Sequence, residues 1–414
     1  MSVTVWSTKK IDQLGFVGRG KSKHRPRDDD RLYNGPYPFF QTGDVKSADF
    51  YLSRYSQTYS EFGLAQSKLW PAGTLCVTIA ANIGESAILA IPGCFPDSVV
   101  GFISDENVSD VRFVKYSIDV FKLRMKAISG GATQDNMSLD KLLSFDFPVP
   151  PLSIQRRIAS ILSAYDDLIE NNRKRISILE EMARRLYHEW FVHFRYPGHD
   201  SVPLVDAPQG RIPQGWNWLT IGSVCNRISS GATPSRENDS FWVVDGLDWY
   251  KTKELWDTDL FGSEEKINYQ ATGARVFEPG TILMAIYGSP TVGRLGLLRA
   301  RASCNQAALG LVANSRQTTT QHLFYQLMFL RDYFNSIAQG AAQQNISKEK
   351  VIETKFLSPP RDILHLFEAQ VGSLADLRFN LNQQLSVLRR TRDLLLPRLM
   401  SGLLSVEAAE AAVP

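Results

Sequence analysis

The chain has 414 residues and a formal net charge of +3, with 43% hydrophobic and 21% charged residues. This length and composition are typical of two or three globular domains, and the near-zero charge lacks the overall basic bias that free-standing DNA-binding domains often carry. The N-terminus has no apolar signal core and no apolar run reaches about 18 residues, so we expect neither a secretory signal nor a membrane span. The four cysteines form no CxxC pair, so we expect neither a disulfide framework nor a zinc ribbon. Together these features predict a cytoplasmic protein.

Residues 1–150 are predicted to form a first globular domain of mixed α/β type. Short β-prone runs at 74–80 and 98–103 are bounded by turn residues, and 111–127 is predicted to be helical. Pro150 and Pro151 end this domain, since proline continues neither a strand ladder nor a preceding helix.

Residues 15–22 fit the GxxxxGKS pattern of phosphate-binding loops. That chemistry needs a helix N-terminus directly after the loop, and the following KHRPRDDD stretch does not favour a helix. We interpret the segment as a cationic loop suited to DNA phosphates or guanine edges. The alternative is a solvated charge run neutralised by 28–30. The cations of this loop are Arg19, Lys21, Lys23, Arg25 and Arg27, with His24 among them.

Residues 151–195 are predicted to form a long helix, because apolar side chains recur at steps of three and four from Ile154 to Leu186. A helix with such a stripe needs a partner to bury it. Asn172 interrupts the stripe, either as a register-fixing polar residue or as a solvated edge position. His188 and His193 are one residue too far apart for a zinc-binding HExxH pattern.

A linker at 196–215, rich in proline and glycine, leads to a second globular domain at 216–359. A second long helix is predicted at 360–405, followed by a flexible tail at 406–414. The Ser-Pro-Pro-Arg sequence ending at Arg361 lacks the aromatic residue of amino-methyltransferase motifs, and Pro96-Asp97 lacks the downstream acid-x-lysine of nucleases. We therefore expect no catalytic residue, no metal ligand and no cofactor in this chain.

The two halves form an internal repeat. Residues 131–138 (GATQDNMS) and 340–347 (GAAQQNIS) match at five of eight positions, at an offset of 209 that also places Pro150-Pro151 on Pro359-Pro360 and one helical stripe on the other. Gln134 and Asn136 thus correspond to Gln343 and Asn345. A repeated residue favours a shared role, such as phosphate contact or capping of the domain–helix junction, over recognition of a particular base.

Three segments carry a resemblance to the specificity subunits of type I restriction–modification systems. Residues 18–45, with the PFFQTGD segment, resemble a common target recognition domain, 212–219 resemble the usual start of the second, and 150–158 with the following helix resemble the conserved spacer region. The resemblance implies a mixed α+β, pseudo-two-fold fold with two α/β target recognition domains joined by two long antiparallel coiled-coil helices.

The resemblance also implies a function without catalysis. Each target recognition domain recognises one half of a bipartite, asymmetric site in double-stranded DNA, and the helix pair sets the unread spacer. Two modification (methyltransferase) subunits dock on the helices, and restriction subunits add translocation and cleavage. S-adenosylmethionine, ATP and Mg are expected on those partners. The alternative is a coiled-coil interaction scaffold that does not bind DNA.

Candidate site residues follow from these patterns. The DNA-contacting candidates of the first domain are Arg19, Lys21, Ser22, Lys23, His24, Arg25, Arg27, Gln41 and Thr42. Those of the second domain are Ser230, Thr233, Ser235, Arg236, Lys251 and Thr252, with Lys251 and Thr252 matching the Gln41 position. The candidates shared by the repeat are Gln134, Asn136, Gln343 and Asn345, and the candidates for subunit docking are Leu179, Leu186, Trp190, Phe191, Leu388 and Leu395.

Overall fold

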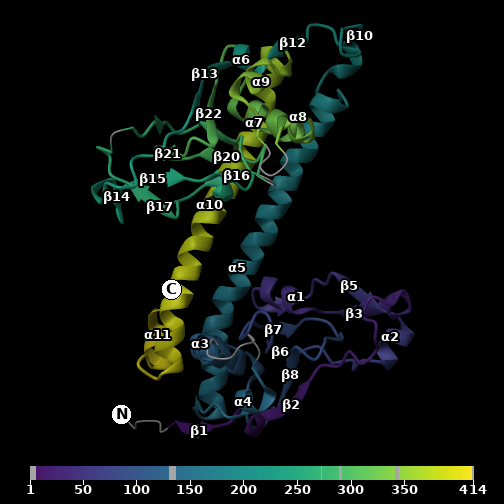
Figure 1. Ribbon diagram of the computed structural model, residues 1–414, viewed down its shortest axis with the longest axis vertical. Helices are drawn as coiled ribbons and strands as arrows, with labels where there is room; N and C mark the ends of the chain where they lie inside the picture. The colour runs from purple at the N-terminus through teal and green to yellow at the C-terminus, as the bar shows by residue number, and fades with distance from the viewer. Residues whose placement is uncertain (1–5, 130–136, 272, 289–290, 341–344, 413–414) are drawn as a thin grey trace. The chain divides into compact units, whose positions relative to one another are not determined.

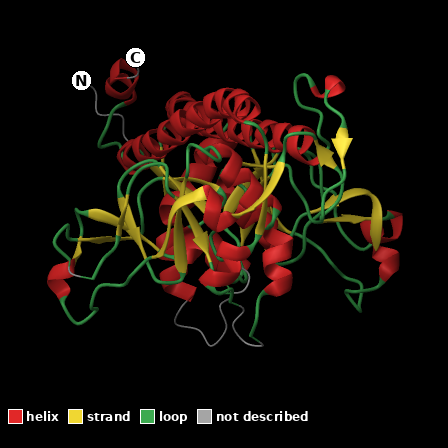
Figure 2. Ribbon diagram, turned by 90° about the horizontal axis from the view of Figure 1, so that it is seen from above, coloured by secondary structure: helices red, strands yellow, loops and turns green. Residues whose placement is uncertain are grey.

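The structure is a computed structural model that describes residues 6–129, 137–271, 273–288, 291–340 and 345–412. The chain divides into two compact units, one comprising Met1–Lys174 with Asn382–Pro414 and the other Arg175–Leu381. Unit 1 and unit 2 each contain helices and strands, as Figures 1 and 2 show, so the predicted mixed α/β class is confirmed.

Unit 1 is built on a five-stranded sheet. Its only parallel pair is β4 with β7, at one edge. Helix α3 (Val111–Ser129) packs against β7, where Ser86 Oγ donates to Asp119 Oδ1 at 2.9 Å. In spatial order the strands are β2 (Gly15–Arg19), β8 (Val99–Ser104), β6 (Leu75–Thr78), β7 (Ser86–Leu89) and β4 (Tyr51–Leu52).

Unit 2 repeats this sheet strand for strand. Its edge pair, β16 with β20, is again parallel and the other pairs are antiparallel. Identical order and direction in both units confirm that the sequence repeat is a repeat of fold. In spatial order the strands are β13 (Cys225–Ser230), β22 (Ala308–Ala313), β19 (Ile282–Ala285), β20 (Leu295–Leu298) and β16 (Thr258–Leu260).

A two-stranded antiparallel sheet leads from each domain into its long helix. In unit 1 it pairs β1 (Ser7–Lys9) with β9 (Phe147–Val149), and in unit 2 it pairs β12 (Asn217–Thr220) with β23 (Lys355–Ser358). The proline pairs follow β9 and β23 directly. Pro151 O accepts from Gln155 N at 3.0 Å and Pro360 O accepts from Leu364 N at 3.2 Å, so each pair starts a helix.

The units differ in the strands inserted between these shared elements. Unit 1 inserts only β3 (Tyr33–Phe39) and β5 (Gln57–Tyr59), which pair antiparallel. Unit 2 has a second five-stranded sheet at the same place. Its strands in spatial order are β14 (Trp242–Val243), β17 (Glu265–Ile267), β15 (Leu247–Tyr250), β21 (Ala302–Cys304) and β18 (Val276–Phe277).

Helices α5 (Leu152–Tyr187) and α10 (Arg361–Met400) confirm the two predicted long helices. Within unit 1, Asp166 of α5 accepts from Arg392 Nη1 of α10 at 2.5 Å, and Asn172 Nδ2 donates to Gln384 Oε1 at 3.2 Å. From the first contact to the second, the residue number increases along α5 and decreases along α10, so the two helical segments run antiparallel. Asn172 is buried, so it is a polar contact between the helices and not a solvated edge position.

In unit 2 the segments of the same two helices also pack together. The ring of Tyr187, at the end of α5, lies 6.3 Å from that of Phe367 near the start of α10. Arg378 of α10 donates from Nε to Asp259 Oδ2 of β16 at 2.9 Å, and both side chains are buried. This ion pair ties the domain sheet to the helix.

The structure differs from the expected flexible tail, because Val406–Ala412 form helix α11. Val406 and Ala409, three residues apart, are buried in the core of unit 1. Arg157 of α5 binds Glu407 and Glu410 at 2.6 Å each. Burial of one apolar face explains why a short alanine-rich segment is helical here.

The predicted linker is also more ordered than its composition indicates. It contains the short antiparallel pair β10 (Leu204–Val205) and β11 (Ile212–Pro213), and the rings of Tyr196 and Trp216 lie 5.3 Å apart in the core of unit 2. In the part of the chain that the structure describes, no helix is long and apolar enough to cross a membrane.

Candidate nucleic-acid interface

The cationic loop of the first domain begins where β2 ends and is held rigidly by its backbone. Gly20 N donates to Val99 O at 2.9 Å, Lys21 N donates to Phe95 O at 3.0 Å, and Lys23 N donates to Gln66 O at 3.2 Å. A Cβ on Gly20 would lie 2.3 Å from the carbonyl oxygens of Phe95 and Pro96, so only glycine fits there. The loop is therefore a fixed support for its exposed side chains.

The same hydrogen bonds argue against a phosphate-binding loop. A phosphate cradle needs free backbone N–H groups and a helix N-terminus, whereas Gly20 and Lys21 already donate to carbonyls. The next regular element is a 3-10 turn, Asp30–Leu32, and not an α-helix. The interpretation of 15–22 as something other than a nucleotide site agrees with this geometry.

The acidic residues after the loop leave its two lysines exposed. Asp29 pairs with His24 and with Arg31, both at 2.7 Å, and the hydrogen bonds from Arg31 hold the pKa of Asp29 well below its usual range. Lys21 and Lys23 are exposed. The alternative of a run neutralised by its own acids therefore does not describe these two cations.

The arginines of the loop are oriented by neighbouring oxygens. Arg19 donates to the backbone oxygen of Asp97 at 3.0 and 2.8 Å, and Arg27 lies 3.3 Å from the carboxylate of the same residue. Arg25 donates to Ser22 O at 2.7 Å and to His24 O at 2.8 Å. These exposed guanidiniums are positioned before any ligand binds.

The structure brings the loop together with the second predicted patch. Ser22 and Arg27 line one open hollow of about 370 Å³ with Gln41 and Thr42, although the two pairs lie far apart in sequence. Gln41 is the residue before α1 (Thr42–Ser47), and its backbone N donates to Asp44 Oδ2 at 2.7 Å. Four of the predicted residues thus share one concave polar surface.

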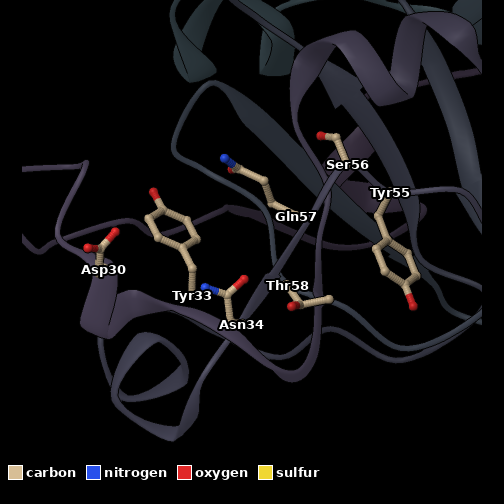
Figure 3. Close-up of a pocket in the computed structure, with 7 residues that line it drawn as sticks. All are labelled: Asp30, Tyr33, Asn34, Tyr55, Ser56, Gln57 and Thr58. Atoms are coloured by element: carbon tan, nitrogen blue, oxygen red, sulfur yellow. The ribbon is translucent and has the colours of Figure 1, made fainter.

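Sequence reasoning missed the residues of β5 and its approach, which border this surface. Figure 3 shows a second open hollow, of about 340 Å³, at the paired strands β3 and β5, in which Tyr33 and Gln57 lie near one another. Both also line the first hollow. The signal in the sequence was the polar run at 53–58, which has no hydrophobic period. The residues of the second hollow are Asp30, Tyr33, Asn34, Tyr55, Ser56, Gln57 and Thr58.

The loop after β13 in unit 2 has the same construction as the loop after β2. Gly231 N donates to Ala308 O at 2.9 Å and Ala232 N donates to Cys304 O at 2.8 Å, which matches the two bonds of Gly20 and Lys21. A Cβ on Gly231 would lie 2.3 Å from the carbonyl oxygens of Cys304 and Asn305. The backbone hydrogen bonds therefore show that the two loops occupy equivalent positions in the two copies.

The second loop contacts an amide and an indole. Thr233 Oγ1 donates to Gln306 Oε1 at 2.5 Å, and the backbone oxygen of Ser235 accepts from Trp242 Nε1 at 3.1 Å. The Arg236 guanidinium carbon lies 3.5 Å from the ring centre of Trp242. The backbone oxygen of Ser230, at the end of β13, accepts from Arg275 Nη1 at 2.9 Å.

Glu265 of β17 joins Arg236 to Lys251. Its two carboxylate oxygens lie 2.7 Å from Arg236 Nη2 and 2.6 Å from Lys251 Nζ. Burial would raise the pKa of Glu265, but the hydrogen bonds from Lys251 and Arg236 lower it below the usual range. Thr252 begins the 3-10 turn Thr252–Glu254 beside this cluster. The structure thus brings two predicted residues, Arg236 and Lys251, onto an acid that the sequence did not single out.

The repeated polar residues are only partly described. Gln134, Asn136 and Gln343 lie outside the described residues. Asn345 exchanges backbone hydrogen bonds of 2.9 Å in both directions with Gln339. Its proposed part in phosphate contact or in the junction stays a prediction.

The predicted docking residues need correction. Trp190 is 5% exposed, Phe191 4% and Leu179 9%, so these side chains are buried within unit 2 and offer no surface to a partner. Phe191 packs at 4.5 Å from the ring of His322 and 4.8 Å from that of Phe367. The large apolar area of aromatic side chains explains their place in this core. The other three, Leu186, Leu388 and Leu395, are half-buried.

Exposed apolar side chains lie elsewhere on the same helices. Ile178 is 59% exposed and Met182 49%, one turn apart on α5 in unit 2. Val387 and Leu394 of α10 in unit 1 are 65% and 60% exposed. These residues, and not the aromatic cluster, are available for contact with another protein.

Comparisons with known proteins agree with this architecture. The type I restriction modification DNA specificity domain matches residues 4–181 and 213–370, so both copies are recognised. The chain is 27% identical to the MjaIX specificity subunit of Methanocaldococcus jannaschii over 97% of its length and 94% of that protein. It is 21% identical to the HindI specificity subunit of Haemophilus influenzae over 67% of its length and 73% of that protein.

Structural comparison shows the same fold at low sequence identity. The crystal structure of the type I restriction–modification S subunit from M. genitalium superposes with a TM-score of 0.65 at 16% identity, covering 96% of this chain and 97% of that one. The two repeated domains and the family matches together lead to one conclusion. The chain belongs to the family of type I restriction–modification specificity subunits, the non-catalytic DNA-recognition members of their complexes.

Proposed function

We propose that each globular domain recognises one half of a bipartite, asymmetric DNA sequence, and that the paired long helices set the spacer between the halves. The observation that supports this proposal most strongly is the duplicated sheet. Each copy has an equivalent loop with a fixed backbone, after β2 and after β13, and the two loops carry different side chains. A shared scaffold with divergent polar loops suits two different half-sites.

The charges of the first loop support contact with nucleic acid. Lys21 and Lys23 are exposed and the arginines beside them are oriented, so the loop can neutralise phosphates and offer donors to base edges. In the second domain the guanidinium of Arg236 is exposed and is oriented by stacking on the indole of Trp242 and by its ion pair with Glu265.

Partner subunits complete the proposed function. We propose that two modification subunits dock on the exposed faces of α5 and α10 and carry out adenine methylation with S-adenosylmethionine. Restriction subunits then supply ATP- and Mg-dependent translocation and cleavage. The chain itself recognises DNA and assembles the complex.

Half-site independence tests this proposal. The full chain with its modification subunit is titrated with duplexes carrying a change in one half-site or in the other, at several salt concentrations. Lys21→Ala with Lys23→Ala should weaken binding and reduce the salt dependence by about two phosphate contacts, and any altered base preference should fall in one half-site only. Equal loss of preference in both half-sites, or salt-independent binding, would contradict the proposal and favour a protein-binding scaffold.

A further inference from the structure

Two pairs of side chains occupy equivalent positions in the two copies. In unit 1, Phe39 of β3 lies opposite Gln57 of β5, and Gln41 is two residues beyond Phe39. In unit 2, Trp249 of β15 lies opposite Glu265 of β17, and Lys251 is two residues beyond Trp249.

The backbone at these positions confirms the equivalence. Lys251 N donates to Glu254 Oε2 at 2.8 Å, three residues ahead, as Gln41 N does to Asp44 Oδ2 at 2.7 Å. Phe40, just before Gln41, donates from its N to Cys94 O at 2.8 Å. Gln41 therefore corresponds to Lys251, and Gln57 to Glu265.

The members of each pair touch in the same way but with different chemistry. Gln41 Nε2 donates to Gln57 Oε1 at 2.6 Å, and Lys251 Nζ donates to Glu265 Oε1 at 2.6 Å. The first pair is neutral, and the second is an ion pair that Arg236 extends. Two domains that recognise different sequences need such a difference at a shared position.

The amide pair leaves one amide oxygen and one amide nitrogen that the hydrogen bond between the two side chains does not use. When Gln41 gives an N–H to Gln57 Oε1, Gln41 Oε1 can still accept and Gln57 Nε2 can still donate. Rotating both amides by 180° exchanges these roles and leaves the same set, so the result does not depend on how the amides are oriented. Both side chains are exposed and line the first hollow.

That set matches a single base in the major groove. Adenine places the N7 acceptor beside the N6 donor, whereas guanine offers two acceptors, cytosine a donor and thymine one acceptor with a methyl group. The pair can bind adenine with two hydrogen bonds. In the second domain both oxygens of Glu265 are already bound, so Lys251 and Arg236 present only donors, which match O6 and N7 of guanine.

We propose that these equivalent pairs are the base-specific contacts of the two domains, with Gln41 and Gln57 selecting an adenine in one half-site. Lys251, held with Arg236 by Glu265, selects a guanine in the other half-site. This inference rests on the proposed function and adds the identity of the contacting residues and bases.

A change of one member of the pair tests the inference. In the variant Gln41→Lys the new ammonium group can donate to Gln57 Oε1, so that only N–H donors are left for a base. This variant, assembled as the full chain with its modification subunits, is used to select duplexes from a library randomised in both half-sites. One position in one half-site should change from adenine to guanine by about tenfold or more, and the other half-site should keep its sequence. Gln57→Glu alone, which leaves two acceptors beside Gln41, should shift that same position toward cytosine.

A matched control is Gln13→Glu, an exposed change in the 3-10 turn Ile11–Gln13 before β2, where the new carboxylate can still accept from Lys10 N. It should leave both half-sites unchanged. If both Gln41→Lys and Gln57→Glu kept the wild-type adenine preference at every position, the inference would be overturned while the proposed function stands. A wild-type complex that selects no sequence at all would instead overturn the proposed function.

Discussion

His322 lies in the aromatic core of unit 2 and is fully buried. Its Nδ1 lies 2.9 Å from Thr318 Oγ1, and its buried Nε2 has no hydrogen-bond partner among the residues that the structure describes. Burial lowers the pKa of His322 to about 3, against about 6.5 in an unfolded chain. The folded protein therefore holds this histidine neutral at neutral pH.

The depressed pKa predicts a loss of stability in acid. Above pH about 6.5 the histidine is neutral in both states and contributes no pH dependence. As the pH falls from about 6.5 toward 3, the unfolded chain takes up a proton that the folded protein does not, so stability is lost, by about 2 kcal/mol at pH 5. Urea unfolding of wild type and His322→Phe at pH 7 and pH 5 measures this, because the variant should lose that part of the pH dependence.

His365, which is exposed on α10, provides the control. His365→Gln should keep the wild-type pH dependence. If His322→Phe also keeps it, the burial of an uncharged His322 is contradicted.

The glycines that begin the two loops predict a second effect. Gly20→Ala and Gly231→Ala each force a Cβ to within 2.3 Å of backbone oxygens, and we expect each to destabilise its unit by about 2 kcal/mol. Thermal unfolding with DNA titration measures both the stability and the affected half-site. Gly372→Ala, in α10 with open space around its Cβ, should instead stabilise by about 0.5–1 kcal/mol. Equal, small effects at all three glycines would show that the loops are not held as described.

At the residue scale the sequence located one side of the candidate site and missed the other. Charge clustering and the GxxxxGKS-like pattern identified Lys21 and Arg27, because their neighbours in sequence are also their neighbours in space. Gln57 and Glu265 contact Gln41 and Lys251 across a strand pair, and only the register reveals that contact. Short strands carry too weak a period for that register to be predicted.

The long helices were the most predictable elements. Apolar residues spaced three and four apart predicted helices at 151–195 and 360–405. In the structure α5 ends at Tyr187 and is followed by a π-helical turn at His188–Val192, and α10 ends at Met400. Helix α11 was missed because seven residues are helical only through tertiary contacts. The burial of Trp190 and Phe191 also depends on tertiary contacts, so the local sequence pattern could not predict it.

Correction of the docking surface gives a prediction at the element scale. Ile178→Asp removes an exposed apolar side chain of α5 and should weaken binding of the modification subunit about tenfold, since an apolar contact is replaced by a solvated charge. Calorimetric titration of the chain with that subunit measures the change. Ser177→Asp, the adjacent exposed residue of the same helix, is the matched control and should bind as wild type. Unchanged binding by Ile178→Asp would remove this face from the proposed interface.

At the scale of the whole molecule, the helices that connect the two units are proposed to set the DNA spacer. Insertion of seven residues after Lys174 and seven after Leu381 preserves a heptad stripe. It lengthens each helix by about 10 Å, at about 1.5 Å per residue. The preferred spacer should grow by about three base pairs, at about 3.4 Å per base pair, with both half-sites unchanged. Selection from a library of spacer lengths measures this, and an unaltered spacer would contradict the helices' role as a ruler.

The duplication itself was predictable because Pro150-Pro151 and Pro359-Pro360 mark the same junction in both copies. The inserted strands were not predictable, since those of unit 2 outnumber those of unit 1 and the equivalence of β15–β17 with β3–β5 is visible only in the strand register. Scaffold positions thus repeat in sequence, whereas the surfaces proposed to contact DNA differ between the copies.

Sequence selection with the wild-type complex tests the central claim most directly. The full chain, assembled with its modification subunit, is used to select bound duplexes from a random library, which are then sequenced. Two short, different sequence blocks separated by a fixed number of unselected base pairs are the predicted result. A single continuous block, or no enrichment under conditions where the complex is assembled, would contradict the claim that two duplicated domains each recognise half of the site.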